Sequence, residues 1–540
     1  MVINASNISK SIGPKTLLVD LNFSISKGEK IALIGRNGQG KTTLLKILAG
    51  IDKDFGGKIE SRKNLRTVLT RQEHLTDYEK TALEYILESV LHYYEFEKIL
   101  VDFEKEIHRD MNLYNHAVEY FTHNGYYYIK DLILASLSDF QISEKLANTR
   151  LLSLSGGEKR YVELVRMMYS KADLLLIDEP TNHMDYIGKE QFISWMQTVS
   201  DSILVVTHDR DVLKYVNKII ELKDKKLFVF NGNYDHYIQQ NATLTTNSVK
   251  QYQNQLNKLT EAKKRVDWGL RMRAKSKAWK IRYDHWLKDY ERIKSETVKP
   301  SFWIDQDSSM DLDKKVADSY HKFKEKNIKI SLNQDKQRAS ELISIKNLSL
   351  GYDTPLFSNI SFSSKNEERV FIKGRNGAGK STIVRTILSL YRKELPIAKI
   401  FTGEIRLGVS LRIGTYEQEI SLEYLKLTLI EALKIIYEEC GNPIPDMKLK
   451  GILAQYLFDP IIDGKQKIED LSGGQKARFQ IIKMLANKPN LLILDEPTNH
   501  LDLPSIEELE NALSDYQGGI LYISHDTYFI KQMGGEVIEI

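Results

Sequence analysis

The chain has 540 residues, of which 42% are hydrophobic and 28% are charged, a composition typical of globular proteins. This length predicts about three to four domains. The net charge of +4 says little about partners, and the single cysteine, Cys440, excludes an internal disulfide and a metal site built from several cysteines. We find no apolar run of about 18 residues and no signal peptide, so we expect a cytoplasmic protein without a membrane segment.

Two glycine-rich loops, each after a short apolar strand and before a predicted helix, have the form G-x-x-x-x-G-K-T/S. The glycines let successive backbone N–H groups turn toward one anion, the lysine reaches the terminal phosphates and the next hydroxyl binds Mg²⁺. The residues expected to contact nucleotide are Gly35, Asn37, Gly38, Gly40, Lys41, Thr42 and Thr43 in the first loop, and Gly374, Asn376, Gly377, Gly379, Lys380, Ser381 and Thr382 in the second.

An acid pair follows a four-residue apolar run in two similar segments, 174–185 (LLLIDEPTNHMD) and 491–502 (LLILDEPTNHLD). The run predicts a buried parallel strand that ends in carboxylates. We expect the first acid to bind Mg²⁺, directly or through water, and the second to polarise an attacking water. These residues are Asp178 and Glu179 in the first segment, and Asp495 and Glu496 in the second.

Two further patterns flank each acid pair. The sequence LSGG begins a predicted helix at Ser155, Gly156 and Gly157, and again at Ser472, Gly473 and Gly474. A helix N-terminus with N–H and hydroxyl donors suits a phosphate presented from outside, although one such motif alone also suits an ordinary helix cap. After the next buried strand come His208 and His525, each placed to contact a γ-phosphate.

Constant spacing shows that these motifs form an internal repeat. Ser155 and Ser472, Glu179 and Glu496, and His208 and His525 are each 317 residues apart. The spacing is 346 between Gln72 and Gln418, so the first half carries 29 extra residues before Ser155. They fall within about 74–142, where apolar residues at helical spacing predict either a longer helix of the lobe or a projecting arm that contacts a partner.

A basic segment separates the two repeats. Residues 241–300 hold 15 Lys/Arg and 6 Asp/Glu, a net charge of +9, so the rest of the chain has a net charge of −5. Such an insert on an acidic body is typical of polyanion binding, although a solvated basic face is the alternative. Two helical stretches, about 248–267 and 275–294, with Gly269 as the break between them, predict a helical hairpin with a basic tip.

Aromatic residues at spacings of 4, 3 and 4 lie on one face of the second predicted helix: Trp279, Tyr283, Trp286 and Tyr290. They could stack on bases, but they match apolar residues of similar phase on the first helix. We therefore favour a seam between the helices: Tyr252, Leu256, Leu259 and Val266 would form its other side. Residues 297–333 are expected to be an irregular return to the second repeat.

Taken together, these motifs resemble those of ATP-binding cassette ATPases, and the repeated EPTNH(M/L)D with a charged linker looks like the ABC-F subfamily. The resemblance covers nearly the whole chain. It implies an α/β fold of two tandem P-loop ATPase domains joined by a basic α-helical hairpin. The expected domains are 1–238, which includes the arm, the linker at 239–340, and 341–540.

The resemblance also implies two composite ATP sites that bind Mg²⁺, each completed by LSGG from the other half, within one chain that acts as a monomer. Site one would comprise Lys41, Thr42, Gln72, Asp178, Glu179 and His208 with Ser472, Gly473 and Gly474. Site two would comprise Lys380, Ser381, Gln418, Asp495, Glu496 and His525 with Ser155, Gly156 and Gly157. The two glutamines would contact both nucleotide and metal, and both sites keep both acids, so both are expected to hydrolyse ATP.

The sequence departs from the family pattern at the residue that contacts the adenine base. An early aromatic residue usually stacks on this base, and Tyr352 fits in the second half, whereas Ile12 occupies the matching position in the first. Apolar contact would therefore replace stacking at site one.

ABC-F proteins with such a linker bind the ribosome, where the hairpin reaches toward the P-site tRNA and the peptidyl-transferase centre. The resemblance thus implies a translation factor or an antibiotic-resistance ribosome protection protein that contacts rRNA and tRNA. Two other classes stay open at this stage: a DNA-acting cassette ATPase, for which the basic hairpin would serve, and the ATPase subunit of a membrane transporter, which gives no reason for the hairpin.

Overall fold

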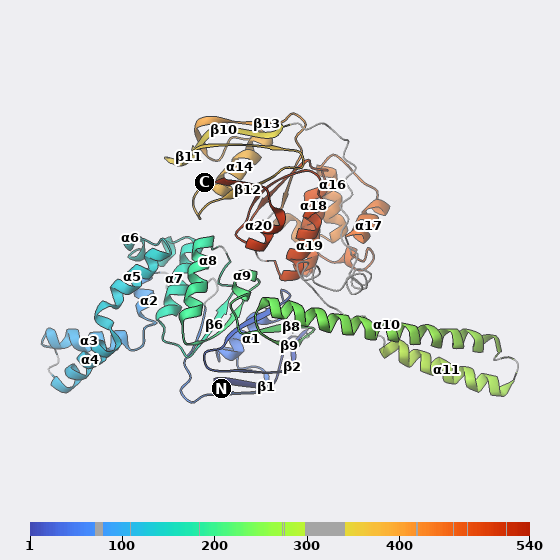
Figure 1. The fold of residues 1–540 in the computed structure, drawn as a ribbon, viewed down its shortest axis with the longest axis horizontal. Coiled ribbons are helices and arrows are strands. Elements are labelled where there is room, and N and C mark those ends of the chain that lie inside the picture. The colour runs from blue at the N-terminus through green and yellow to red at the C-terminus, as the bar shows by residue number, and fades with distance from the viewer. Residues whose placement is uncertain are drawn as a thin grey trace. The chain divides into compact units, whose positions relative to one another are not determined.

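The computed structural model describes residues 1–13, 15–70, 79–107, 110–182, 184–272, 274, 276–296, 341–416, 420–456, 458–471, 473–499, 501–514 and 516–540. The chain forms two compact units, one made of Met1–Tyr234 with Lys329–Ile540 and the other of Asp235–Ile328 (Figure 1). Among the described residues, none of the helices has the length and hydropathy needed to span a bilayer. The domain boundaries expected after 238 and 340 stay predictions.

The first half is built on a six-stranded sheet of order β5-β6-β7-β3-β8-β9. Its strands are β3 (Lys30–Gly35), β5 (Thr67–Leu69), β6 (Leu174–Asp178), β7 (Ser202–Val206), β8 (Lys218–Lys223) and β9 (Lys226–Asn231). All neighbours are parallel except β8 and β9. Every residue of β6 and β7 is buried, as expected for apolar strands in a sheet covered on both faces. The carboxyl ends of β3, β6 and β7 therefore meet at one edge.

The second half repeats this plan with a five-stranded sheet of order β14-β15-β16-β12-β17, parallel throughout. Its strands are β12 (Arg369–Lys373), β14 (Ile413–Tyr416), β15 (Leu491–Asp495), β16 (Gly519–Ile523) and β17 (Glu536–Glu539). A small antiparallel sheet accompanies each half: β1 (Ile3–Ile12), β2 (Lys15–Ile25) and β4 (Gly56–Ser61) in the first, and β10 (Glu341–Gly351), β11 (Pro355–Lys365) and β13 (Lys399–Leu407) in the second.

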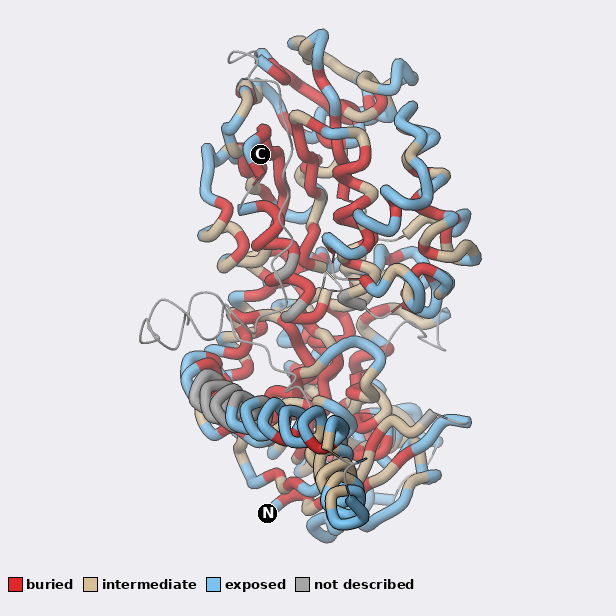
Figure 2. Tube along the Cα trace, turned by 90° about the vertical axis from the view of Figure 1, so that its right-hand side faces the viewer, coloured by how far each residue is buried: buried red, intermediate tan, exposed pale blue. Residues whose placement is uncertain are grey.

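Helices accompany the sheets in both halves. The first half has α1 (Lys41–Leu48), α6 (Glu144–Ala147), α7 (Gly156–Tyr169), α8 (Tyr186–Thr198) and α9 (Arg210–Leu213). The second has α14 (Lys380–Tyr391), α15 (Leu422–Leu425), α16 (Leu429–Glu439), α17 (Asp446–Gln455), α18 (Gly473–Leu485), α19 (Leu503–Ser514) and α20 (Thr527–Met533). Figure 2 shows that the buried residues concentrate in the strands and the inner faces of these helices.

The segment that holds the extra residues of the first half contains four helices, α2 (Ala82–Leu87), α3 (Tyr93–Glu104), α4 (Met111–Asn124) and α5 (Ile129–Asp139). Helices α3 and α4 pack side by side and project from the sheet (Figure 1). Aromatic rings hold the pair together, with Phe96 stacked on Tyr120 at 4.3 Å and Phe103 on Tyr114 at 4.1 Å between ring centroids. Helices α3 and α4 thus project as a pair, and the contact of such an arm with a partner stays a prediction.

The second unit contains the predicted hairpin, formed by α10 (Tyr234–Met272) and α11 (Lys277–Glu296). The four aromatic residues of α11 are half-buried, and Leu259 and Val266 of α10 are too, which supports the seam rather than free stacking faces. The side chains of Tyr252 and Leu256 lie outside the described residues, as does the expected return at 297–333.

The expectation that Gly269 breaks the first helix is wrong. Helix α10 continues through Gly269 to Met272, and this glycine is buried. A Cβ atom at this position would lie 3.0 Å from the Trp286 ring and 3.4 Å from Tyr283. The glycine therefore serves close packing of α10 on α11, a requirement that outweighs its cost of about 1 kcal/mol inside a helix.

Gly269→Leu should separate the two helices, because the added side chain has no room beside Trp286; overpacking of this kind costs about 1–3 kcal/mol. We expect faster hydrogen exchange in both helices of the hairpin, with the sheets unaffected. Ala278→Leu, at an exposed position of α11, is the matched control and should leave exchange unchanged. Equal exchange in both variants would contradict the packing role of Gly269.

Candidate nucleotide-binding sites

The two glycine-rich loops form matching anion cradles between β3 and α1 and between β12 and α14. Gly38 and Gly40 have φ values of 78° and 101°, and Gly377 and Gly379 have 80° and 102°, a region that glycine adopts without strain. Each loop ends at the N-terminus of its helix, where free N–H groups and the helix dipole favour phosphate.

The loop lysines are curled over their own loops. The Lys41 Nζ atom donates to the Gly35 and Arg36 carbonyls, and Lys380 Nζ donates to the Gly374 and Arg375 carbonyls at 2.9 Å each. Burial lowers the pKa of both lysines. A buried ammonium group held at the mouth of an anion cradle suits the terminal phosphates of a nucleotide.

The first acid of each pair lies beside the hydroxyl that follows the loop lysine. Thr42 Oγ1 donates to Asp178 Oδ2 at 2.8 Å, and Ser381 Oγ donates to Asp495 Oδ1 at 3.2 Å. Burial raises the pKa of both aspartates. A hydroxyl and a carboxylate at this distance are the oxygen ligands that Mg²⁺ takes next to a phosphate, so the residues present fit this metal.

The second acids are held against the histidines in a strained backbone conformation. Glu179 and Glu496 have φ values of 46° and 48°, uncommon for residues other than glycine and frequent at functional sites. Glu179 Oε1 lies 3.5 Å from His208 Nε2, and Glu496 Oε1 lies 3.3 Å from His525 Nε2. Each site thus pairs one carboxyl group with one imidazole.

Desolvation controls the charges of these pairs. Burial raises the pKa of Glu179 to about 8 and that of Glu496 to about 7. Burial also lowers the pKa of His525 to about 3 and that of His208 well below its usual value. Glu496 Oε1 and His525 Nε2 are buried without a hydrogen bond of good geometry, which leaves them available to a bound group.

Contacts between the halves connect each loop to the other half. Asn37 N donates to Asp502 Oδ2 at 3.1 Å, and Asn376 N donates to Asp185 Oδ2 at 3.3 Å. Each of these aspartates closes the EPTNH(M/L)D segment of the opposite half. The arrangement is reciprocal, so both loops lie at the contact between the halves.

A cavity of about 210 Å³ brings LSGG of the first half beside the loop of the second, with Ser155, Gly157, Asn376 and Gly377 among its lining residues. A second cavity of about 180 Å³ is lined by Glu179, His208 and His525. Both cavities are lined by residues of the two halves, and the cavity of about 210 Å³ joins one LSGG segment to the opposite loop.

The LSGG serine is also a structural cap. Ser155 Oγ accepts a hydrogen bond from Glu158 N, and the Glu158 side chain returns to Ser155 N, which forms a capping box for α7. Gly156 and Gly157 have open space where a Cβ would lie. In the second half Gly473 begins α18, followed by Gly474.

Three expected site residues, Gln72, Gln418 and Ser472, lie outside the described residues. The positions expected at the two adenines are both exposed, Tyr352 by 52% and Ile12 by 57%, so either side chain is accessible to a base.

Two cations near the sites were missed by motif reasoning. Arg160 on α7 donates to the backbone carbonyls of Asp178 and Glu179 and so supports the acid pair. Lys189 on α8 donates to the His525 carbonyl of the other half. The repeat offset of 317 would have singled them out, because Ala477 and Ile506 occupy the matching positions in the second half.

Comparisons with known proteins agree with this geometry. A family described as ABC transporter matches residues 18–182 and 357–499, and a second family of the same description matches 220–305. The chain is 31% identical to the ATP-binding protein YdiF of Bacillus subtilis, over 100% of this chain and 80% of the relative. It is 30% identical to ABC transporter F family member 2 of Arabidopsis thaliana, over 100% of this chain and 76% of the relative.

The energy-dependent translational throttle protein EttA of Escherichia coli is 27% identical, over 100% of this chain and 92% of the relative. Among solved structures, the archaeal ribosome recycling factor aABCE1, in complex with the archaeal ribosomal stalk protein aP1, has a TM-score of 0.57 at 17% identity. The match covers 99% of this chain and 87% of that one. This likeness shows a shared fold.

The raised pKa values predict how stability changes with pH in the absence of nucleotide. A carboxyl group with a higher pKa in the folded chain binds more protons when folded, so the free energy of unfolding falls as the pH rises between its unfolded and folded pKa values. These windows run from 4.5 to about 8 for Glu179 and to about 7 for Glu496. The lowered pKa values of the histidines act only below 6.5.

At pH 9 the free energy of unfolding of Glu179→Gln/Glu496→Gln, measured by urea denaturation, should therefore exceed that of the parent. The difference should be at least about 1.4 kcal/mol, the equivalent of one pKa unit. The two proteins should differ little at pH 5. The same change at exposed Glu423 and Glu438 is the control and should show no such divergence. A constant gap from pH 5 to pH 9 would contradict the desolvation of these carboxyl groups.

Proposed function

The chain belongs to the ABC-F family of ATP-binding cassette proteins and is an ATPase, and from this premise we propose that it hydrolyses ATP at two composite sites. The observation that carries the proposal is the reciprocal contact in which Asp185 and Asp502 each bind the loop of the opposite half. Site one and site two would have the residue sets that the sequence predicts, with LSGG supplied across the contact.

In this mechanism the chain positions phosphate and neutralises charge, which is the main requirement of phosphoryl transfer. The loop N–H groups and Lys41 or Lys380 hold the β- and γ-phosphates. Thr42 with Asp178, and Ser381 with Asp495, would hold Mg²⁺, which when bound neutralises charge on the phosphate oxygens. The opposite LSGG would close over the γ-phosphate.

Glu179 and Glu496 would accept a hydrogen bond from the attacking water and orient it. The low pKa of His208 and His525 keeps both imidazoles neutral at physiological pH. A neutral imidazole beside the glutamate can donate a hydrogen bond to the γ-phosphate through one ring nitrogen. The strained backbone of each glutamate fixes its carboxyl group at the strand end before nucleotide arrives.

We propose in addition that the partner is the ribosome and that the protein acts on translation in the cytoplasm, as a translation factor or an antibiotic-resistance ribosome protection protein. EttA, named a translational throttle, supports this through its similarity along the chain. The hairpin supports it too: its aromatic rings fill the seam, whereas Arg271, Lys280 and Arg282 are exposed. Exposed cations on a rigid hairpin suit the phosphates of rRNA and P-site tRNA.

Glutamate-to-glutamine changes test the two-site mechanism. Glu179→Gln and Glu496→Gln should each leave one working site, and the double variant should lose turnover by at least about 100-fold, a typical cost of removing a group that orients the reaction. Steady-state phosphate release with saturating ATP measures this. A single variant that keeps the full parent rate would show that its site does not contribute.

The double variant should bind ribosomes when ATP is present, because trapped ATP holds the halves together. Co-sedimentation with purified ribosomes, with and without ATP, measures this binding, and translation assays should show inhibition. If the variant stays in the supernatant with ribosomes and instead shifts branched DNA, or follows a membrane fraction, the proposed partner is wrong although the ATPase mechanism stands.

The hairpin cations should carry much of that affinity. Arg271→Glu/Lys280→Glu/Arg282→Glu in the double variant should weaken ribosome binding by at least about tenfold and flatten its salt dependence, because fewer counterions are released. The matched control reverses three exposed lysines of the second half, Lys426, Lys448 and Lys450. If both triple variants lose the same affinity for ribosomes, the hairpin cations contribute no more to binding than other exposed lysines.

A further inference from the structure

Helices α8 and α19 occupy matching places in the two halves. They differ in the residue that lies one turn after the start of each helix. Asp185 and Asp502 stand before the first helical residue of each, and both reach the opposite glycine-rich loop. Four residues later the first half has Lys189 and the second has Ile506. A side chain that can donate three hydrogen bonds thus has an apolar counterpart.

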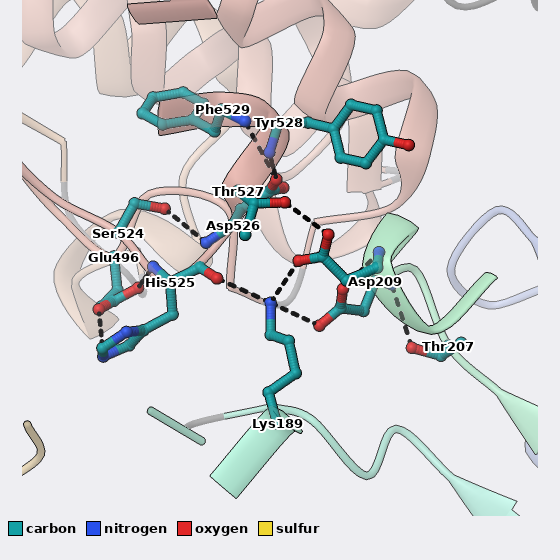
Figure 3. Close-up of polar contacts among 11 residues, drawn as sticks. Lys189, Thr207, Asp209, Glu496, Ser524, His525, Asp526, Thr527, Tyr528 and Phe529 are labelled. Carbon is teal, nitrogen blue, oxygen red and sulfur yellow. Dashed lines mark hydrogen bonds and ion pairs between the residues drawn. The ribbon is translucent and has the colours of Figure 1, made fainter. Parts of the chain in front are cut away.

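Lys189 is buried, and its ammonium group meets three acceptors (Figure 3). Nζ lies 2.7 Å from the His525 carbonyl oxygen, 2.9 Å from Asp209 Oδ2 and 3.2 Å from Asp211 Oδ2. These three partners use all the donors of the ammonium group. Although burial lowers the pKa of Lys189, Asp209, Asp211 and Asp526 raise it above its usual value, so the side chain stays charged.

The three acceptors come from both halves. Asp209 and Asp211 follow His208 in the first half, whereas the carbonyl belongs to His525, the histidine beside Glu496. Thr527 Oγ1 also donates to Asp211, so the segments 208–211 and 525–527 are joined directly (Figure 3). We call this cluster of Lys189, Asp209, Asp211, His525 and Thr527 the histidine bridge.

The repeat does not provide a second bridge. The counterparts of Lys189 and Asp211 are Ile506 and Tyr528, and only Asp526 keeps the charge of its counterpart Asp209. Asp526 caps α20 by accepting from the backbone of Tyr528 and Phe529, as Asp209 caps α9 by accepting from Asp211 N. Neither Ile506 nor Tyr528 can form an ion pair, and the other buried ion pair between the halves, Arg210 with Glu510, does not involve the Ile506 position.

We propose that Lys189 is a positioning residue of the first half that holds the His525 segment at site two and makes the two ATP sites unequal. The inference rests on the proposed assignment of Glu179 to site one and Glu496 to site two. Lys189 fixes the backbone of His525, whose side chain lies 3.3 Å from Glu496 and whose N–H donates to Glu496 Oε2 at 3.2 Å. The backbone of His208 at site one has no matching lysine, because Ile506 occupies that place in the second half.

The bridge also makes site two sensitive to the first half. The 208–211 segment carries the histidine of site one and two of the three acceptors of Lys189. Movement of this segment therefore displaces Lys189 and changes its hydrogen bond to the His525 carbonyl. Coupling of this kind between two sites is worth roughly 5–150-fold in an equilibrium. This coupling acts equally in both directions on the conformational equilibrium, whereas the effect on kcat is expected at site two, where Lys189 holds the His525 segment.

The test measures turnover at one site at a time. Glu179→Gln leaves site two as the working site, and Glu496→Gln leaves site one. Lys189→Ile, which introduces the residue that the second half already uses, should lower kcat in the Glu179→Gln protein by about tenfold, within the range for coupled sites. The KM for ATP should change little, because the loop contacts of ATP are intact. In the Glu496→Gln protein the loss should stay below about twofold.

Two controls separate positioning from general stability. Lys189→Arg keeps the charge and the donors and should restore most of the site-two rate. Glu510→Gln weakens another buried contact between the halves, in which Glu510 Oε1 lies 2.9 Å from Arg210 with both side chains 2% exposed. Glu510 lies on the His208 side of the contact, so any loss from Glu510→Gln should not be larger at site two. If Lys189→Ile does not fold, Lys189→Gln keeps a donor for the His525 carbonyl and should give a smaller loss confined to site two.

Equal losses at both sites from Lys189→Ile, a larger loss at site one, or no loss would overturn the inference. Failure of the proposed function looks different. If Glu179→Gln/Glu496→Gln without any Lys189 change still hydrolyses ATP at the parent rate, the assignment of the glutamates is wrong, whatever Lys189 does.

Discussion

Desolvation of an acid pair at the carboxyl end of a buried strand is the constraint on which both sites depend. Strands β6 and β15 are apolar and lie inside parallel sheets, so the residues that follow them emerge at an edge with little water. At this edge each aspartate accepts a hydrogen bond from a hydroxyl group. Each glutamate lies beside an imidazole that burial keeps neutral. The raised pKa values of the carboxyl groups reflect the cost of holding charge in such a place.

That cost explains why the two halves need each other. A cluster of buried acids is costly unless cations, dipoles or a bound ligand compensate it. The loop lysines compensate part of it within each half, and the loop N–H groups receive a carboxylate from the opposite half. ATP with Mg²⁺ would supply the remaining positive charge and phosphate contacts, so nucleotide binding and contact between the halves are expected to strengthen each other.

Duplication placed the same motifs in both halves, yet the charges around them have diverged. Arg160 supports one acid pair where the second half has Ala477, and Lys189 faces one histidine segment where the second half has Ile506. Arg210 and Glu510 add a second buried ion pair between the halves, with Thr527 and Ile193 as counterparts. The sites therefore share their catalytic groups but differ in what holds those groups in place.

Much of this was predictable from the sequence, because the decisive signals are local. Glycine spacing, apolar runs before acid pairs and a constant offset were enough to predict the two α/β halves, the hairpin and its seam. Signals that depend on tertiary contact were misread or invisible. Gly269 looked like a helix break, since its packing against Trp286 lies beyond any local pattern. No local motif singles out Lys189, since its acceptor at His525 is distant in sequence.

The most direct test of the central claim is a structure of the Glu179→Gln/Glu496→Gln protein bound to ATP and Mg²⁺. We expect two nucleotides, one between the loop at Lys41 and the LSGG at Ser472, and one between the loop at Lys380 and the LSGG at Ser155. Lys189 should contact the His525 carbonyl, with no matching contact at His208. Nucleotides bound to the loops alone, with each LSGG far from the opposite phosphate, would contradict the account of two composite sites.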